Sequence, residues 1–338
     1  MNNNKSYSRR SFLRMSAIAG AGISIIPFSS VESSISAKST NSILEAVQGK
    51  RIGIIGLDTS HSEVFTKMIN SGIIKGGYQV VAAYPHGSPD IPAALKMKPN
   101  ITAAVKGMGV EIVDSIEMLL EKVDVVLLET IDGRPHYEQA LPVLKARKRM
   151  FIDKPIAASL EDAKAIFEAS KKYSSPVFSS SALRFDPTVQ KVVSGSIGKV
   201  TGADVYTPAE IDPNHLDLAW YGIHGVEMLF TVMGPGCKKV SRVFQEGTDL
   251  VTGIWEDGRI GTVRGIRKGA ANIAGTAFGE NGIAPLGPFS SYNPLVERII
   301  DFFETGIPPV SEAETIEIFN FMHAADLSRK KKGKTISL

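Results

Sequence analysis

Short apolar runs alternate with helical patterns over the first half of the chain. The runs cover residues 51–56, 80–84, 123–128 and 150–153, and the helical segments cover residues 63–72, 116–120 and about 135–146. The runs are continuous rather than alternating, which is typical of strands buried on both faces. Strands that alternate with helices indicate a parallel sheet. The sequence therefore predicts an α/β domain built on a doubly wound parallel sheet.

The pattern changes after residue 200 to shorter, alternating stretches. Runs at 251–255 and 260–266 flank the turn Glu256-Asp257-Gly258-Arg259. Asp-Gly between alternating runs is a strong hairpin signal. Two helical patterns follow, at 296–303 and 313–327. A chain of 338 residues with such a change of pattern is expected to form about two domains.

The charge is concentrated at the N-terminus. Residues 1–37 carry four basic side chains and one acidic one, and this balance of +3 equals the formal charge of the whole chain. The remaining 301 residues balance at 34 basic and 34 acidic side chains. A body without a basic excess argues against a nucleic-acid-binding protein. The single cysteine, Cys237, excludes an intramolecular disulfide and a zinc site made of cysteines.

Residues 1–37 have the pattern of a signal peptide. Ser8-Arg9-Arg10-Ser11-Phe12-Leu13 precedes a mildly apolar run at 15–28, and the arginine pair resembles a twin-arginine export signal. The run is too short for a membrane span, and cleavage is expected after Ala37. We therefore expect a periplasmic protein exported by the twin-arginine machinery, with no stable membrane span. The alternatives are an uncleaved anchor or a chance pair of arginines.

The turn after the first predicted strand contains part of a dinucleotide-binding fingerprint. That fingerprint, G-x-G-x-x-G, lets the backbone approach a pyrophosphate. Here Gly56 is present, but Asp58 and His61 stand at the second and third glycine positions. Thr59 and Ser60 could contact the phosphates at a helix N-terminus, or Asp58, Thr59 or Ser60 could cap that helix. The second strand also ends without the acid that binds the ribose, so these residues alone leave nucleotide binding open.

Five segments in order carry a family resemblance. They are Glu129-Thr130-Ile131-Asp132-Gly133-Arg134-Pro135-His136, Asp153-Lys154-Pro155, Leu183-Arg184-Phe185-Asp186-Pro187, Ser194-Gly195-Ser196-Ile197-Gly198-Lys199-Val200 and Gly222-Ile223-His224-Gly225-Val226-Glu227. Together they resemble the glucose–fructose oxidoreductase, inositol dehydrogenase and MocA (Gfo/Idh/MocA) family.

The resemblance implies a domain plan. A signal peptide at 1–37 and a linker at 38–50 would precede a Rossmann-like dinucleotide-binding domain at 51–155. Residues 156–338 would form a substrate and oligomerisation domain of the α+β class, with an open, largely antiparallel sheet. The free face of such a sheet is a dimer interface in the family, so a homo-oligomer is expected.

The same resemblance implies catalytic and substrate-binding residues. Lys154 and His224 are the expected acid and base groups, and Glu227 lies one helical turn after His224. Trp220 and Tyr221 would contact the substrate, with the indole stacked on a sugar ring. Trp220 stands where many sugar-active members carry an aspartate, which is a departure from their mechanism.

The resemblance also implies residues around an NAD or NADP molecule that is held tightly. These are Gly56, Asp58, Thr59, Ser60, His61, Thr130, His136, Lys154 and Arg184. A capping role for His136 and a bridge between domains for Arg184 are the structural alternatives. The six histidines include no H-x-H or H-x-x-x-H pair, so no metal site is expected.

These observations predict an exported oxidoreductase that acts on a sugar, glycoside or polyol. Because a trapped cofactor outside the cytoplasm cannot exchange with a nucleotide pool, the predicted reaction is redox-neutral or resets its own cofactor. Cleavage of a glycoside or epimerisation would meet that condition. The alternatives are a nucleotide-free, sugar-binding accessory protein and a nucleotide-free lyase or hydrolase that keeps Lys154 and His224.

Overall fold

The computed structural model describes residues 50–338, so the predicted signal peptide and nearly all of the predicted linker lie outside the described residues. The first sheet is entirely parallel and has the strand order β3-β2-β1-β4-β5-β6. Its strands are β1 (Arg51–Ile55), β2 (Gln79–Tyr84), β3 (Glu111–Ile112), β4 (Val125–Leu128), β5 (Met150–Ile152) and β6 (Val177–Ser179). The order reverses between β1 and β4, which is where open α/β sheets bind ligands.

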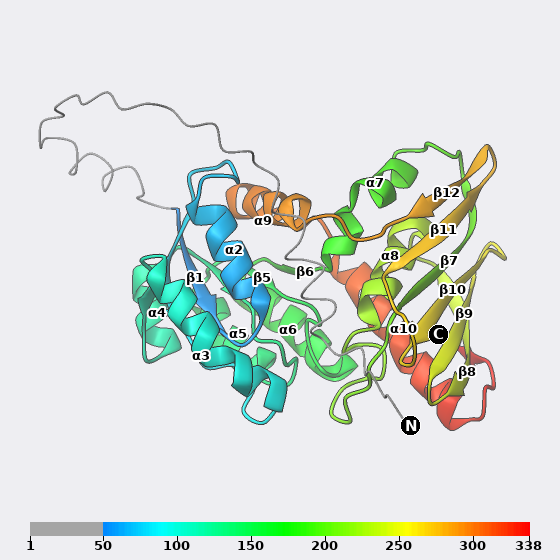
Figure 1. Cartoon of the computed structure of the whole chain (residues 1–338), viewed down its shortest axis with the longest axis horizontal. Helices are drawn as coiled ribbons and strands as arrows, with labels where there is room; N and C mark the ends of the chain where they lie inside the picture. The colour runs from blue at the N-terminus through cyan, green and yellow to red at the C-terminus, as the bar shows by residue number, and fades with distance from the viewer. Residues whose placement is uncertain (1–49) are drawn as a thin grey trace, which may run out of the picture.

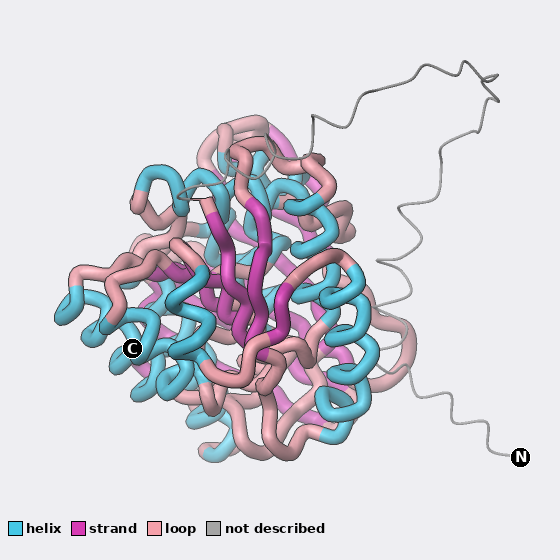
Figure 2. Tube along the Cα trace, turned by 90° about the vertical axis from the view of Figure 1, so that its left-hand side faces the viewer, coloured by secondary structure: helices cyan, strands magenta, loops and turns pink. Residues whose placement is uncertain are grey.

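Helices cover both faces of this sheet (Figure 2). They are α2 (Ser60–Asn70), α3 (Pro92–Gly107), α4 (Ile116–Lys122), α5 (His136–Lys145) and α6 (Leu160–Tyr173). Phe65 of α2 and Val105 of α3 are buried in one core cluster, whereas Leu119, Val143 and Ile166 of α4, α5 and α6 are buried in another. The predicted doubly wound sheet is thus confirmed. No helix within residues 50–338 has the length and apolar character that crossing a bilayer requires.

Two features of this region differ from the sequence prediction. The helix α3 was not predicted, because Pro99 interrupts it and only Ala94, Ile101 and Val105 are buried along its length. The parallel sheet also continues past residue 155, since α6 and the edge strand β6 extend it to Ser179. The apolar run of β6 is only three residues long, which is too short for a periodicity argument.

The second sheet is mixed and has the order β12-β11-β7-β10-β9-β8-β13. Its strands are β7 (Val200–Pro208), β8 (Cys237–Gln245), β9 (Thr248–Trp255), β10 (Ile260–Ile266), β11 (Ala274–Gly279), β12 (Gly282–Leu286) and β13 (Ile336–Ser337). Only the β7–β10 pair is parallel, so the predicted, largely antiparallel sheet is confirmed. The β9–β10 hairpin turns at the predicted Asp257-Gly258, where Gly258 has φ of +86°.

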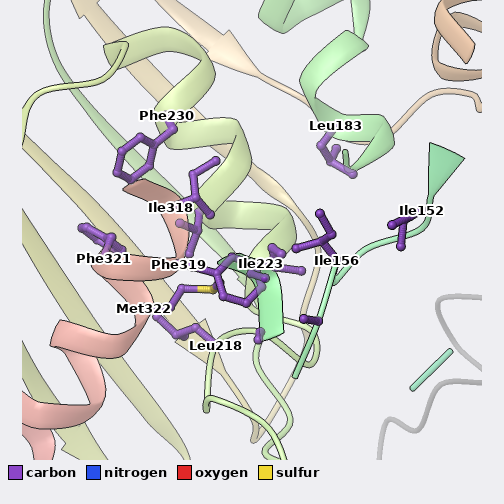
Figure 3. Close-up of a cluster of buried hydrophobic side chains, with 14 of the residues drawn as sticks. Ile152, Ile156, Leu183, Leu218, Ile223, Phe230, Ile318, Phe319, Phe321 and Met322 are labelled. Carbon is purple, nitrogen blue, oxygen red and sulfur yellow. The ribbon is translucent and has the colours of Figure 1, made fainter. Parts of the chain in front are cut away.

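Helices pack on one face of the second sheet and connect it to the first (Figure 1). They are the 3₁₀ helix η2 (Ala182–Phe185), α7 (Pro187–Val193), α8 (Ile223–Met233) and α10 (Glu312–Lys330). Figure 3 shows Phe230 of α8 and Phe319 and Met322 of α10 in one cluster that reaches Ile152 at the end of β5. One apolar core therefore runs from the first sheet into the second and fixes α8 beside the ends of the parallel strands.

The chain returns to the first domain near its end. Helix α9 (Asn293–Thr305) lies beside α2 (Figure 1) and buries Leu295, Ile299 and Phe302 in the same cluster as Ile52 and Phe65. The residues just before α9, including Tyr292, are thereby brought to the N-terminus of α2. Sequence reasoning predicted the helix but assigned it to the second domain.

Candidate functional site

Polar side chains gather at the carboxyl ends of the parallel strands. The segments that follow β1, β4, β5 and β6 begin at Gly56, Glu129, Asp153 and Ser180 respectively. Helix α8 of the second domain adds His224 and Glu227, and all of these side chains are buried. The fold thus concentrates buried polar groups where its topology places a ligand site.

Gly56 brings the turn after β1 against the turn after β4. Its φ is +88°, and a Cβ atom there would lie 2.4 Å from Thr130 Oγ1 and 2.6 Å from the Thr130 backbone nitrogen. Only glycine fits this approach, since any side chain would clash with backbone and the positive φ would be strained. Gly56 therefore lets the turn after β1 pack closely against the turn after β4, while its predicted part in binding a nucleotide stays a prediction.

Asp58 ties three loops together and does not cap the helix. Its Oδ2 accepts a 2.6 Å hydrogen bond from the Ser88 backbone N–H and its Oδ1 a 3.1 Å bond from the Ile131 N–H. Burial raises the pKa of this carboxyl, although the two N–H donors oppose the rise. The N-cap of α2 is Thr59, whose hydroxyl accepts from the His61 N–H. Of the three capping residues considered from sequence, Thr59 is the one in place.

The turn after β1 is compatible with a dinucleotide although it lacks the second and third glycines of the fingerprint. Asp58 is only 1% exposed, so a phosphate approaching from solvent would not meet an exposed carboxylate. Thr59 and Ser60 begin a helix of 11 residues, whose N-terminal N–H groups and dipole favour an anion. The acid nearest the end of β2, Asp90, is paired with Arg134. The phosphate end of the site therefore fits a nucleotide through a helix N-terminus rather than through three glycines.

Lys154 follows β5 and is only 7% exposed. Within residues 50–338 its ammonium group makes no ion pair as short as 4.0 Å, and its Nζ lies 5.8 Å from the centre of the Tyr221 ring. Its positive charge acts on the pKa of three buried neighbours, Glu129, Asp153 and His224. Lys154 is thus a buried charge close to several titratable groups.

His224 is held in position by Ser181. The hydroxyl of Ser181 lies 2.7 Å from His224 Nδ1, and the Leu183 N–H donates to the same oxygen. Burial, followed by the positive charge of Lys154, lowers the pKa of His224 well below its usual value. The imidazole is therefore uncharged near pH 7. A group that exchanges a proton with a hydroxyl alternates between a charged and an uncharged form, and His224 is in the uncharged one.

Glu227 organises the turn that carries Ser181. It accepts hydrogen bonds from the Ser181 N–H at 2.8 Å, the Ser180 hydroxyl at 3.0 Å and Arg184 Nε at 3.2 Å. Burial raises its pKa, and Arg184 opposes the rise. Arg184 also donates to Glu314 of α10 at 2.7 Å, so it links η2 to both α8 and α10. Glu227 thus acts on the imidazole through Ser181.

Trp220 and Tyr221 have different surroundings. Trp220 is 4% exposed and packs with Ile91, Ala94 and Ile131 of the first domain. Tyr221 is half-buried, with its ring 6.4 Å from that of His224. The indole therefore packs between domains, while the phenol ring lies beside Lys154 and His224.

His136, which begins α5, and Thr130, which follows β4, are both fully buried. The two ring nitrogens of His136 face carbonyl oxygens, of Ile156 at 3.0 Å and of Thr130 at 2.8 Å. The Thr130 hydroxyl donates to Gln139. These bonds join the turns after β4 and β5, so the pair supports the site from below.

His61 contacts one acidic residue, Asp153, and lies close to a second, Glu129. Its Nδ1 lies 2.7 Å from Asp153 Oδ2 and its Nε2 lies 3.0 Å from the Tyr292 hydroxyl. Glu129 lies beside them, and one ligand atom from each of His61, Glu129 and Asp153 falls within 4.8 Å of the others. The search for metal ligands by histidine spacing missed this group, because its members follow three different strands. The usable signal was an acidic residue directly after each of two buried strands.

The chain is similar to known dehydrogenases. Residues 50–180 match the family described as "Oxidoreductase family, NAD-binding Rossmann fold", Gfo/Idh/MocA. A myo-inositol 2-dehydrogenase from Thermotoga maritima is 30% identical over 220 residues, which are 60% of this chain and 59% of that protein. The chain thus spans about three-fifths of the length of this curated relative.

Solved structures have the same fold. The myo-inositol dehydrogenase of Lactobacillus casei, in complex with NAD(H) and myo-inositol, gives a TM-score of 0.68 at 18% identity, over 85% of this chain and 96% of that one. The myo-inositol 2-dehydrogenase of Lactobacillus plantarum gives 0.70 at 17% identity, over 85% and 99%.

These similarities support the family predicted from the motifs. The predicted fold class is confirmed by the superpositions, which cover 85% of the chain. Residues 50–180 match a family described by its NAD-binding Rossmann fold, in agreement with the predicted nicotinamide cofactor. The part of the site contributed by α8 lies outside the matched residues, so its roles rest on geometry.

Proposed function

We propose that this protein is an NAD-dependent oxidoreductase of the Gfo/Idh/MocA type that acts on a hydroxyl group of a cyclic polyol or sugar. One observation carries the proposal: Lys154, at the end of β5, and His224, of the second domain, are both buried and lie beside the same ring, that of Tyr221, at 5.8 Å and 6.4 Å from its centre. The inositol dehydrogenases to which the chain is similar indicate the substrate class.

The two residues have complementary roles. Oxidation of an alcohol requires a group that takes the hydroxyl proton, and Lys154, in its uncharged amine form, is the proposed acceptor. His224, whose pKa burial lowers well below its usual value, is uncharged and binds the same hydroxyl. Ser181 fixes the ring through Nδ1, and Glu227 fixes Ser181. Tyr221 borders the substrate next to both groups.

The residues that would hold the nucleotide are those around the turn after β1. Gly56 allows the close approach of the loops, and Thr59 and Ser60 present the N-terminus of α2 to the phosphates. Bound NAD would supply the hydride acceptor. The chain itself orients the substrate and moves its proton.

The first test is NAD binding and turnover by the purified protein. NADH fluorescence should report binding, and NAD⁺ reduction should be followed with myo-inositol, scyllo-inositol and a panel of hexoses. Lys154→Met and His224→Gln should each lower kcat by ~10²–10⁴-fold, the usual contribution of an acid–base group, while NADH binding persists. Lys145→Met, which changes an exposed lysine of α5, is the matched control and should leave both properties unchanged. Failure to bind NADH would favour the nucleotide-free alternatives, and full activity of Lys154→Met would refute the proposed base.

We also propose export through the arginine pair and a redox-neutral or self-resetting reaction. Both follow from the pattern of residues 8–28, because a nucleotide inserted before export has no pool with which to exchange. Replacing Arg9 and Arg10 by lysine should retain the protein in the cytoplasm. Denaturation of the mature protein should release one NAD(H) or NADP(H) per chain, which mass spectrometry would identify. A protein that leaves the cell without nucleotide would contradict the trapped-cofactor mechanism.

A homo-oligomer is proposed on the free face of the second sheet. Val243, Ile260 and Ile283 are exposed there by 68%, 53% and 70%. Sedimentation analysis should show a dimer or larger assembly, and Ile283→Lys should weaken it. A monomer at all concentrations would contradict the expectation.

A further inference from the structure

A buried group of metal-ligating atoms lies under the carboxyl ends of β4 and β5, and the proposed function does not use it. Its members are His61 at the start of α2, Glu129 after β4 and Asp153 after β5. One ligand atom from each lies within 4.8 Å of the others. Metal–nitrogen and metal–oxygen distances of ~2.0–2.2 Å place two ligands of one ion at most about 4.4 Å apart, so a small inward shift of these side chains would let them surround one cation.

Glu129 provides a second, independent observation. Its side chain is fully buried, yet neither carboxylate oxygen has a hydrogen-bond partner within residues 50–338. Asp153 Oδ1 is buried and unpartnered in the same way. Buried carboxylates are normally paired, hydrogen-bonded or bound to a metal, since an unpartnered one is strongly unfavourable. Three orphaned oxygens in one cluster therefore require a positively charged or proton-donating ligand.

The neighbouring cations do not satisfy these oxygens. Lys154 forms no ion pair within 4.0 Å of Glu129 or Asp153 among the described residues. Of the carboxylate oxygens in this cluster, His61 contacts Asp153 Oδ2 alone, with its Nδ1 at 2.7 Å. That contact itself requires a proton or a cation between the two atoms. His61 Nε2 is meanwhile oriented by the Tyr292 hydroxyl at 3.0 Å, in the way that a partner of the second nitrogen orients a metal-bound histidine.

We infer that His61, Glu129 and Asp153 bind a divalent transition-metal ion. The donor set decides the class of ion. One imidazole nitrogen with two carboxylates suits Zn²⁺, Mn²⁺ or Fe²⁺, whereas Mg²⁺ and Ca²⁺ prefer oxygen alone. Three protein ligands leave at least one coordination position for water or for an oxygen of a substrate, as in catalytic rather than structural sites.

Calorimetry with the purified full chain tests the inference without any substrate. After chelation and desalting, the wild-type protein should bind about one equivalent of Mn²⁺ or Zn²⁺, and Mg²⁺ should bind much more weakly. Glu129→Gln keeps the shape of the side chain and should weaken Mn²⁺ or Zn²⁺ binding by at least ~100-fold, more than the 10–100-fold that loss of an outer partner produces. Glu227→Gln is the matched control, because that buried carboxylate has hydrogen-bond partners on both oxygens and lies outside the cluster.

Cobalt spectroscopy is a second readout that does not depend on one variant folding. Co²⁺ added to the wild-type protein should give visible absorption bands of a nitrogen- and oxygen-coordinated ion, and His61→Gln should change their position and intensity. Thermal unfolding should show stabilisation by Zn²⁺ or Mn²⁺ in the wild-type protein and in Glu227→Gln, but not in Glu129→Gln.

Two results would overturn the inference. One is the absence of binding by the wild-type protein to Mn²⁺, Zn²⁺ and Co²⁺. The other is equal binding by Glu129→Gln, which would place the ion elsewhere on the surface. In either case the cluster would be a set of carboxyls that share protons. NADH binding measured on the same samples is a separate outcome, so failure of this inference and failure of the proposed function are distinguishable.

Discussion

Two of the regions in which the protein buries charge differ in how completely the charges are paired. In the second domain, Arg242 is fully enclosed and binds three aspartates, Asp217 at 2.8 Å, Asp249 at 2.8 Å and Asp326 at 3.0 Å. At the ends of β4 and β5, by contrast, neither oxygen of Glu129 has a hydrogen-bond partner among residues 50–338. A paired network holds a fold together, whereas unpaired buried charge is retained where a ligand or a reaction uses it.

The Arg242 network extends beyond its three aspartates. Arg329 binds Asp217 at 2.6 Å and Arg267 binds Asp249 at 3.3 Å. The guanidinium carbons of Arg242, Arg267 and Arg329 lie 5.2, 4.8 and 3.6 Å from the centre of the Phe244 ring. In the part of the chain that the structure describes, Asp249 Oδ1 has no hydrogen-bond partner, so the pairing is nearly but not fully complete. These contacts join β8 and β9 to α10 and the segment before α8.

The largest effect is expected from breaking this network. Arg242→Met should lower the free energy of unfolding by ~3–5 kcal/mol, since it leaves buried carboxylates without their main counter-charge. Urea unfolding measures the change. Arg298→Met, which removes an exposed ion pair with Asp301, is the control and should change stability by ~0–1 kcal/mol. A small effect of Arg242→Met would mean that the aspartates are stabilised by Arg267 and Arg329 instead.

The same network predicts a pH dependence. Burial, followed by the charge of Asp217, raises the pKa of Asp326 to about 6, against the opposing charges of Arg242 and Lys330. A folded-state pKa above the unfolded value of 3.8 means that the protonated form stabilises the fold. This stability is present below pH 3.8 and is lost as the pH rises through about 6.

Asp326→Asn removes that titration. Relative to the wild-type protein, the variant should gain ~3 kcal/mol of unfolding free energy as the pH rises from 3.8 to above 6, because about two pKa units correspond to that amount. Urea unfolding at several pH values gives the difference, and only its change with pH matters, since the lost Arg242 contact adds a constant. A difference that stays flat across this range would show that Asp326 titrates normally.

The two regions also differ in how far sequence could predict them. Apolar runs and the Asp-Gly turn predicted both sheets, because burial and turn geometry depend on neighbouring residues in the chain. Motif order predicted Lys154 and His224. The link from Glu227 through Ser181 to His224 could not be predicted, since it joins β6 to α8 across 43 residues. Tyr292 meets His61 only because α9 returns to the first domain.

A smaller effect on the free energy of unfolding tests the cluster of His61, Glu129 and Asp153. Two matched variants should change that free energy in opposite directions. In chelated buffer near pH 7, Glu129→Gln should stabilise the protein by ~1 kcal/mol, because burial and the charge of Asp153 disfavour a carboxylate at this position and the amide is neutral. Glu227→Gln should instead destabilise it by ~1–3 kcal/mol, because donors from Ser180, Ser181 and Arg184 lose their charged acceptor. Thermal unfolding of both variants gives the signs, and a loss of stability in Glu129→Gln would mean that its carboxylate is already satisfied.

The smallest expected change in stability compares two helix caps. Ser159 caps α6 with a 3.0 Å bond from the Asp162 N–H, whereas Thr59 caps α2 with a 3.5 Å bond from the His61 N–H. Ser159→Ala should therefore cost about 1 kcal/mol of unfolding free energy, and Thr59→Ala ~0.5 kcal/mol or less. If Thr59 binds the nucleotide phosphates, Thr59→Ala should weaken NADH binding, whereas Ser159→Ala should leave it unchanged. Urea unfolding and NADH titration of the same two samples separate these effects. Equal losses of stability with unchanged NADH affinity would make Thr59 an ordinary cap, and the phosphates would then have to bind through other groups of the turn.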